Sequence, residues 1–257
     1  VKARVSPVLA VWFGYALAAI LLLDVLDLQV WTVVVIAVAA VLAAVPRLRP
    51  KAASSVDRED LVAVGLMYAG VVAAFYAAFR VFTVDNVLGL FLCFAAGLLL
   101  GVVGPVVYQV WIRGRALRSL GIGTHQWRPT VAMGLVLAGA QFAVTMWGFD
   151  LPGAEQWVTL LGMSLVVGFF EAVFFRGFIQ GRLEASLGPV PAVAGAAALY
   201  AAYHVGYGMD VSEMWFLLGL GVLYAVIYRL TSNVLILWPL LTPIGAFFNN
   251  LNDPEIE

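Results

Sequence analysis

The amino-acid sequence predicts an all-α, polytopic membrane protein. Of its 257 residues, 63% are hydrophobic and only 11% are charged, whereas about a quarter of the residues of an ordinary soluble domain are charged. The hydrophobic stretches are long and do not alternate with polar residues, which favours helices over a membrane β-barrel. This composition excludes a soluble enzyme and a disordered chain. A net charge of −1 indicates no polyanion, and therefore no nucleic acid, as a partner.

Nine hydrophobic segments approach the length of about 20 residues that a spanning helix needs. They lie at residues 7–27, 30–46, 61–83, 87–112, 130–148, 157–186, 189–206, 214–230 and 233–251. The second is short, and Pro239 and Pro243 interrupt the last. We therefore expect about eight to nine transmembrane helices. No cleavable signal is expected, because the first segment leads into the second without a small-residue cleavage site.

The distribution of basic residues predicts the orientation of these segments. With nine spans, almost all lysines and arginines fall on one side of the membrane, and most acidic residues fall on the other. The basic residues on that side are Lys2, Arg4, Arg47, Arg49, Lys51, Arg58, Arg113, Arg115, Arg118, Arg128, Arg182 and Arg229. By the positive-inside rule, the N-terminus is then cytoplasmic and the C-terminus lies outside.

The chain divides into three parts by its pattern. Residues 1–112 form N-terminal transmembrane helices without a recognised motif, although Gly97 and Gly101 make a small-residue pair typical of close helix packing. Residues 113–129 carry four arginines and are expected to be a basic cytoplasmic connector at the membrane interface. Residues 130–257 form the helical core that holds the polar residues described next.

Most charged residues of the hydrophobic segments lie near segment ends, but three ionisable residues lie deeper, where each costs about 2.5–3.5 kcal/mol on insertion scales. Glu171 and Arg176 belong to the sixth segment, and His204 ends the seventh. A buried pair of this kind either carries a function or only fixes helix packing, and the pattern leaves both interpretations open. On an α-helix Arg176, five residues beyond Glu171, would not share its face. We expect it to pair with another carbonyl or acid, or to orient the glutamate indirectly.

Glu171 and His204 are predicted to lie at one depth. The turn between their segments should centre on residues 187–189, because Gly188 ends one helix and Pro189 begins the next. Each residue is about 16 positions from that centre, which is roughly 24 Å at 1.5 Å per residue. If their faces meet, such a pair can take a proton from water and pass it to a leaving amine.

The sequence contains few residues that could bind a metal ion or form a disulfide bond. The one cysteine, Cys93, excludes an intrachain disulfide. Two histidines and one cysteine make a protein-only zinc site hard to assemble, since even a catalytic zinc takes about three protein ligands. No cofactor is therefore expected.

The polar residues form a pattern that resembles the CPBP intramembrane proteases, the group of CAAX prenyl proteases and bacteriocin-processing (Abi) proteins. The first family motif, Glu-Glu-x-x-x-Arg followed by glycine, matches Glu171 and Arg176, and the second, Phe-x-x-x-His, matches Tyr200 and His204. The resemblance covers about residues 151–251. It implies a CAAX-protease-like core, a bacterial cell membrane, and a water molecule activated by Glu171 with help from His204. Arg176 and Tyr200 take supporting positions, and zinc enters only through the label often given to the family.

The sequence departs from the family in two places. Ala172 replaces the second glutamate, and the third motif, His-x-x-x-Asn, is not visible. Thr242 occupies the place expected for its histidine, which serves the family as an oxyanion donor. Thr242, or an amide of Asn249 or Asn250, is the only substitute for that donor that this segment offers. The alternative is that Pro239 and Pro243 form a kink that serves helix packing alone.

The resemblance implies an intramembrane endopeptidase that acts in the lipid bilayer on a membrane-associated peptide or protein. The alternative is a catalytically inactive protein of the same fold that binds a peptide or a partner protein, which the loss of the second glutamate and of the third motif favours. A transporter is a third hypothesis. Against it, the sequence has no visible inverted repeat and suggests only one discontinuous helix.

Overall fold

The structure is a computed structural model that describes residues 6–44, 55–82, 87–123, 126–148, 153–207 and 209–240. These residues form helices joined by turns and include no strand, which confirms the all-helical class. Four helices of the described part are long and hydrophobic enough to cross a membrane, namely Arg58–Val81, Leu92–Ile112, Leu161–Leu187 and Val211–Thr231. The larger count of eight to nine spans stays a prediction.

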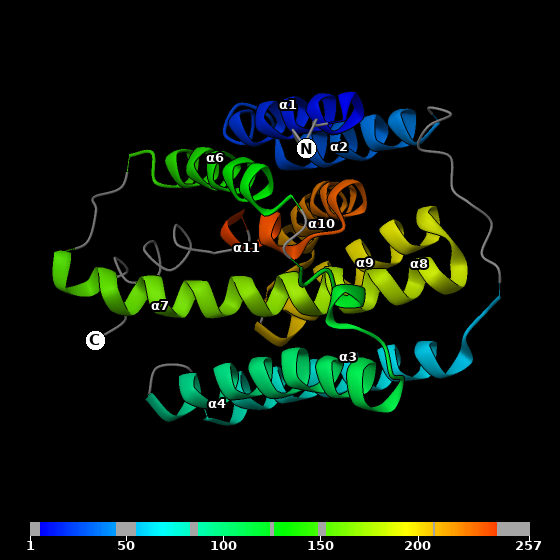
Figure 1. Cartoon of the computed structure of the whole chain (residues 1–257). Coiled ribbons are helices and arrows are strands. Elements are labelled where there is room, and N and C mark those ends of the chain that lie inside the picture. Colours follow the sequence, from blue (N-terminus) through cyan, green and yellow to red (C-terminus); the bar gives the residue numbers. More distant parts are fainter. Residues whose placement is uncertain are drawn as a thin grey trace.

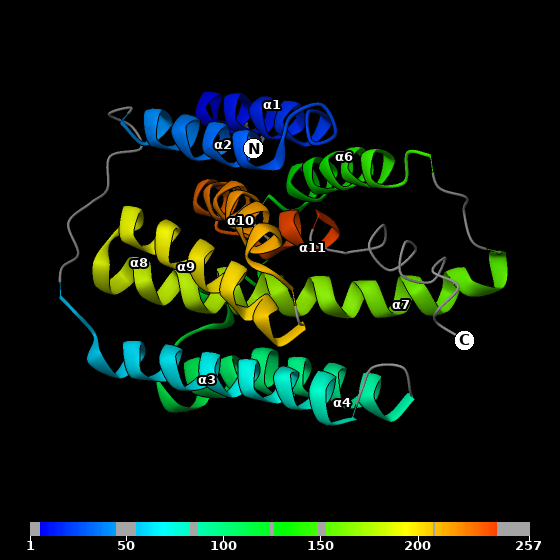
Figure 2. The ribbon, with the colours of Figure 1, turned by 180° about the vertical axis from the view of Figure 1, so that it is seen from behind.

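The helices form three layers, and two of these lie on the outside (Figure 1). One outer layer consists of α1 (Pro7–Leu21), α2 (Leu28–Ala43) and α6 (Trp127–Thr145). The opposite outer layer contains α3 (Arg58–Ala77) and α4 (Val87–Leu98). The view from behind in Figure 2 shows the same order of layers.

The middle layer contains the helices that carry the polar motif residues. Its members are α7 (Ala154–Glu171), α8 (Gly181–Leu187), α9 (Pro189–Tyr203), α10 (Val211–Thr231) and the short α11 (Leu237–Leu240). The aromatic and aliphatic core runs through this layer. Helices on both sides thus shield its polar groups from lipid.

Side-chain caps determine where several helices begin. Ser6, Asp27, Asp57 and Asp210 each accept a hydrogen bond from a backbone N–H in the first turn of the following helix. A cap of this kind satisfies donors that have no partner within the helix. The helices therefore start within a few residues of the hydrophobic segments that the sequence predicts.

The predicted hairpin between the sixth and seventh segments is confirmed. Gly188, at a φ of +86°, ends α8, and Pro189 begins α9. Glycine adopts a positive φ without the clash of a Cβ atom, and proline at the first helical position lacks only an N–H that would have no partner there. α8 and α9 therefore run antiparallel from the turn that the sequence indicates.

The helix that carries Glu171 changes type after this residue. α7 continues without interruption into the π-helical segment η6 (Ala172–Gln180), which leads into α8. A π-helix closes each turn with an i→i+5 hydrogen bond, and the N–H of Gly181 donates in this way to the carbonyl of Arg176. Side-chain directions in η6 therefore differ from those that α-helical spacing gives.

Small residues permit close packing on both sides of this long helix. A Cβ atom added to Gly101 would collide with the ring of Phe170, and one on Gly97 would touch the same ring. The predicted role of this glycine pair in close helix packing is confirmed. On another side, the carbonyl of Leu120 packs against Gly177.

Gly177→Ala should destabilise the fold, because the added methyl group has no room beside the Leu120 carbonyl. Overpacking of this kind costs typically about 1–3 kcal/mol. Gly162→Ala, in α7 of the same long helix, is the matched control, since a Cβ atom there meets no atom within 4 Å. Thermal unfolding in detergent should show a lower melting temperature for Gly177→Ala only, and equal melting temperatures would contradict this account of the packing.

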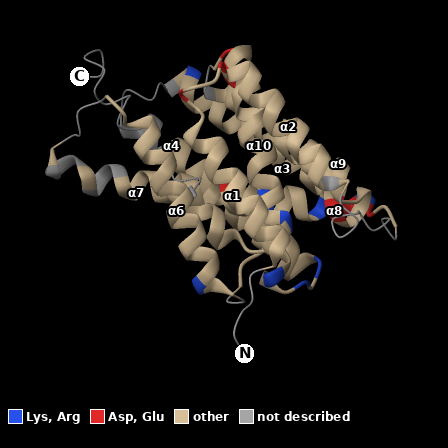
Figure 3. Cartoon of the chain, turned by 90° about the horizontal axis from the view of Figure 1, so that it is seen from above, with Lys and Arg blue, Asp and Glu red and all other residues tan. Residues whose placement is uncertain are grey.

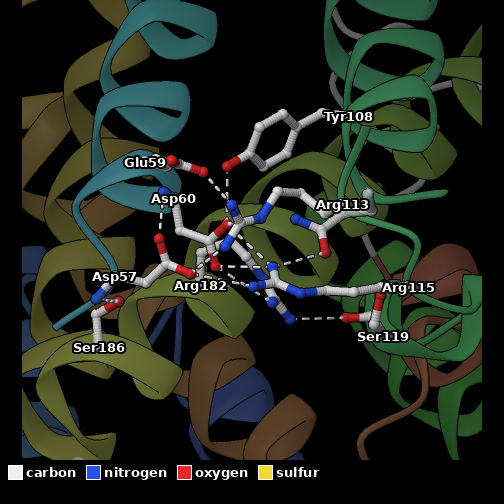
Figure 4. A network of polar contacts seen from close by, with 10 residues as sticks. Asp57, Glu59, Asp60, Tyr108, Arg113, Arg115, Ser119, Arg182 and Ser186 are labelled. Atoms are coloured by element: carbon white, nitrogen blue, oxygen red, sulfur yellow. Dashed lines mark hydrogen bonds and ion pairs between the residues drawn. The ribbon is translucent and has the colours of Figure 1, made fainter. Parts of the chain in front are cut away.

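A buried carboxylate joins three parts of the chain at one end of the molecule (Figure 4). Asp60, at the start of α3, is fully buried. It accepts hydrogen bonds from the Tyr108 hydroxyl at 2.9 Å and from Arg115 Nη1 at 3.0 and 2.8 Å. Arg182 Nη1 on α8 lies 3.5 Å from its Oδ2. We call Asp57, Asp60, Arg113, Arg115 and Arg182 the Asp60 cluster.

The connector after residue 112 therefore packs against protein over part of its length. Arg113 and Arg115 both turn toward the start of α3, where Arg113 binds Asp57 and Glu59 and Arg115 binds Asp57 and Asp60. Figure 3 shows most of the described arginines on the side of the molecule where α8 lies, with acidic residues at the same end. The orientation of this end relative to a membrane stays a prediction.

Stability should decrease at acid pH through Asp57. The pKa of its carboxyl lies below the usual value because the backbone N–H of Asp60 donates to it and Arg113 and Arg115 are close by. A group with a lowered folded-state pKa stabilises the fold above its unfolded-state pKa of about 3.9, and this contribution is lost as the pH falls through the folded-state pKa. Melting temperatures of the parent and of Asp57→Asn should therefore converge as the pH is lowered from 7 toward 3. A constant difference would show that this carboxylate does not titrate with unfolding.

Candidate active site

Glu171 lies at the junction of α7 and η6 and is buried, with 5% of its surface exposed. Its carboxylate faces α9. The Tyr203 hydroxyl donates to Oε1, and the Tyr200 hydroxyl lies 3.5 Å from Oε2. Two phenol groups of one helix therefore hold a carboxylate that belongs to another.

Arg176 lies on the same side of the long helix as Glu171, which corrects the expectation from α-helical spacing. Its Cζ atom is 5.1 Å from the centroid of the Tyr200 ring, and the hydroxyl of the same tyrosine reaches Glu171. The reason is the π-helical turn, because an i→i+5 hydrogen bond places a residue nearly above the one five positions earlier. Arg176 is fully buried, and among the described residues its guanidinium nitrogens have no hydrogen-bond acceptor. It stabilises this region through the cation–π contact with Tyr200.

His204 begins the 3₁₀ turn η7 (His204–Tyr207), directly after α9. Its Nδ1 lies 2.8 Å from the Tyr200 carbonyl oxygen, which can only accept, so the proton belongs on Nδ1 and Nε2 is the basic nitrogen. Its ring packs on that of Tyr203 at 4.1 Å between centroids. Glu171 and His204 thus contact the same tyrosine, while a hydrogen bond between the two stays a prediction.

Aromatic rings fix Tyr203 in place. Phe175 lies 4.7 Å away between ring centroids, Phe75 6.1 Å and Phe170 6.3 Å, and only 1% of the Tyr203 surface is exposed. Aromatic pairs at such distances contribute about 0.5–1.5 kcal/mol beyond the burial of their area. The hydroxyl that binds Glu171 therefore sits on a ring with little freedom to move.

Sequence reasoning missed several polar members of this region. The sequence indicates no role for Tyr203, which directly precedes the motif histidine. Tyr224 and Gln141 lie in segments that are predicted only as transmembrane helices. In the structure the Tyr224 hydroxyl donates to Gln141 Oε1 at 3.0 Å, and the Tyr224 ring lies 6.2 Å from that of Tyr200. Tyrosines within hydrophobic segments were the available signal, because a buried phenol usually finds a hydrogen-bond partner.

The predicted substitutes for the third motif lie outside the described residues. These are Thr242, Asn249 and Asn250, together with Pro243. The described part of this segment ends in η8 (Val234–Ile236) and α11, which contains Pro239. Within the described ranges, no group of three or more His, Cys, Asp or Glu side chains could hold a metal ion.

A comparison with protein-family models matches residues 153–242 to the Type II CAAX prenyl endopeptidase Rce1-like family. Comparisons with curated proteins and with solved structures gave no match. The matched segment runs from α7 to just beyond α11 and contains Glu171, Arg176, Tyr200 and His204. The resemblance predicted from these residues is thereby confirmed for the segment from residue 153 to residue 242, which matches the model of the Rce1-like family.

Proposed function

We propose that the protein is an intramembrane endopeptidase that cleaves a membrane-associated peptide or protein, with Glu171 as the general base. The observation that carries the proposal is the environment of the Glu171 carboxylate. It is buried between helices of an Rce1-like segment, held by hydroxyls of α9, and close to the ring that packs on His204. An ionisable residue that is this costly to bury among hydrophobic helices is a functional candidate by default.

The reaction that this arrangement supports is the hydrolysis of a peptide bond. Glu171 takes a proton from a water molecule, and the water oxygen forms a bond to the scissile carbonyl carbon. The tetrahedral intermediate then breaks its C–N bond, and the proton passes to the leaving amine. One water molecule is consumed, and the products are a carboxylate and an amine. His204, whose Nε2 is the basic nitrogen, assists the proton transfer.

The supporting roles follow from the contacts. Tyr200 contacts both motif residues of the long helix. Its hydroxyl lies at hydrogen-bond distance from Glu171, and its ring makes a cation–π contact with Arg176. Thr242, Asn249 and Asn250 remain the proposed donors toward the oxyanion. The environment is a lipid bilayer, with a cytoplasmic N-terminus and an external C-terminus, and the reaction needs no cofactor.

One observation favours the alternative, a catalytically inactive protein of the same fold that binds a peptide or a partner protein. Ala172, at the place of the second family glutamate, is fully buried among core side chains. The site therefore has one acidic group where the family pattern has two. Binding without cleavage would need only the shape of the core and not the basicity of Glu171.

Hydrolysis in H₂¹⁸O distinguishes the two functions. The purified protein is reconstituted in liposomes with a membrane-anchored peptide that ends in a CAAX sequence, with and without a prenyl group. Cleavage by the proposed reaction places one ¹⁸O atom in the new carboxyl group, which mass spectrometry detects. An intact peptide that stays bound to the purified protein after the liposomes are dissolved in detergent would support the binding protein instead.

A further inference from the structure

Among the described residues, the hydrogen-bond partners of the Glu171 carboxylate come from α9 and not from its own helix. The adjacent residue, Ala172, has no polar side chain, and Arg176 binds the Tyr200 ring. Oε1 accepts the hydrogen bond of Tyr203, whereas Oε2 lies 3.5 Å from the Tyr200 hydroxyl, at the outer limit of a hydrogen bond. The two carboxylate oxygens are therefore unequal, and Oε1 is the anchored one.

A general base benefits from this inequality. A glutamate side chain has three torsions and loses conformational entropy when it is fixed. If one oxygen is held by a rigid donor, the other is directed to a constant place where a water molecule can give up its proton. Tyr203 is such a donor, because Phe75, Phe170 and Phe175 surround its ring.

The same tyrosine also connects the base to the histidine. Its ring packs against His204 while its hydroxyl binds Glu171, so one side chain determines where both groups lie. Tyr200 contacts Glu171 as well, but at the longer distance and with its ring engaged by Arg176. Tyr203 is thus better placed than Tyr200 to orient the carboxylate.

We infer that Tyr203 is a positioning residue, whose hydroxyl holds Oε1 of Glu171 so that Oε2 faces the water to be activated. This inference rests on the proposed function, because it assumes that Glu171 is the base. Tyr203 would thus orient the Glu171 carboxylate from α9. Ala172, the residue that follows Glu171, cannot do so because its side chain has no polar atom.

The test compares Tyr203→Phe with Tyr68→Phe in reconstituted protein. Both substitutions remove one phenol oxygen and keep the ring. Tyr68 is the matched control, because its hydroxyl donates to the Leu199 carbonyl of α9 at 3.0 Å, away from Glu171. Tyr203→Phe should lower kcat about tenfold to a hundredfold, the range expected when a reacting group is slightly misplaced, and should leave KM and the melting temperature near those of the parent. Tyr68→Phe should leave kcat unchanged.

An infrared measurement gives a second result that does not depend on turnover. The carboxyl band of Glu171 is identified by its loss in Glu171→Gln. This band should shift in Tyr203→Phe, since the hydrogen bond to Oε1 is gone, and should stay in place in Tyr68→Phe. An unshifted band, or a Tyr203→Phe protein with the kcat of the parent, overturns the inference.

The outcomes separate this inference from the proposed function. If Glu171→Gln is inactive while Tyr203→Phe is fully active, Glu171 is supported as the general base, but Tyr203 does not position it. If Glu171→Gln cleaves as fast as the parent, or the parent does not cleave, the proposed function fails and the positioning role fails with it. A drop of kcat in Tyr203→Phe accompanied by an equal loss of folded protein would show a structural role only.

Discussion

Replacing Glu171 with glutamine should abolish peptide cleavage and leave the fold intact. Glutamine has nearly the same size, and its one amide oxygen can still accept the hydrogen bond from Tyr203, but it cannot take a proton from water. A lost general base lowers kcat by roughly a hundredfold to ten-thousandfold. The measurement is the single-turnover rate on a membrane-anchored peptide in liposomes, together with the melting temperature of the purified variant.

Glu184→Gln is the matched control for this substitution. Glu184 lies further along the same continuous helix, in α8, where it binds Gln180 and pairs with Arg229. Its replacement should leave the rate of cleavage within about twofold of the parent, because no contact links it to Glu171. Equal rates for the parent and Glu171→Gln would remove Glu171 from the mechanism, whatever the control shows.

Replacing Asp60 with alanine should cause the largest loss of stability. The substitution removes the carboxylate that Arg115 and Arg182 bind, and leaves their cations together at the start of α3 (Figure 4). Breaking a buried ion pair costs about 3–5 kcal/mol. The lower end applies here, since the Arg113 and Arg115 side chains keep 24% and 28% of their surface exposed. The melting temperature should fall by about 10 °C.

Glu59→Ala is the comparison for Asp60→Ala. Glu59 is the preceding residue and also pairs with Arg113, but 75% of its side-chain surface is exposed. Exposed ion pairs contribute about 0–1 kcal/mol, because water screens them. Similar melting temperatures for the two variants would show that the Asp60 cluster is not a stabilising element.

The fold was predictable where hydrophobic length alone decides it. The hydrophobic segments 61–83, 87–112, 157–186 and 214–230 correspond to the four helices that could cross a membrane. The turn at Gly188 and Pro189 followed from the backbone preferences of those two residues, glycine at a helix end and proline at a helix start. The Asp60 cluster was not predictable, because its members are distant in the chain and each reads as an ordinary charge at a segment end.

The candidate site was predictable in its residues but not in its geometry. Glu171 and His204 stand out because an ionisable group within a hydrophobic segment is costly. Tyr203 does not, since a tyrosine in such a segment is common and its partner depends on the packing of two helices. Arg176 was placed on the wrong face because the sequence does not reveal that the helix after Glu171 is π-helical.

The π-helical turn also has a consequence for protein design. In this turn, two residues that are five positions apart share a side, whereas an α-helix brings together residues that are three or four positions apart. A designer who transplants the Glu171–Arg176 arrangement into an idealised α-helical bundle must therefore place the two residues four positions apart. A graft that keeps the natural spacing would point the arginine away from the tyrosine ring that receives it, although every residue of the motif would be present.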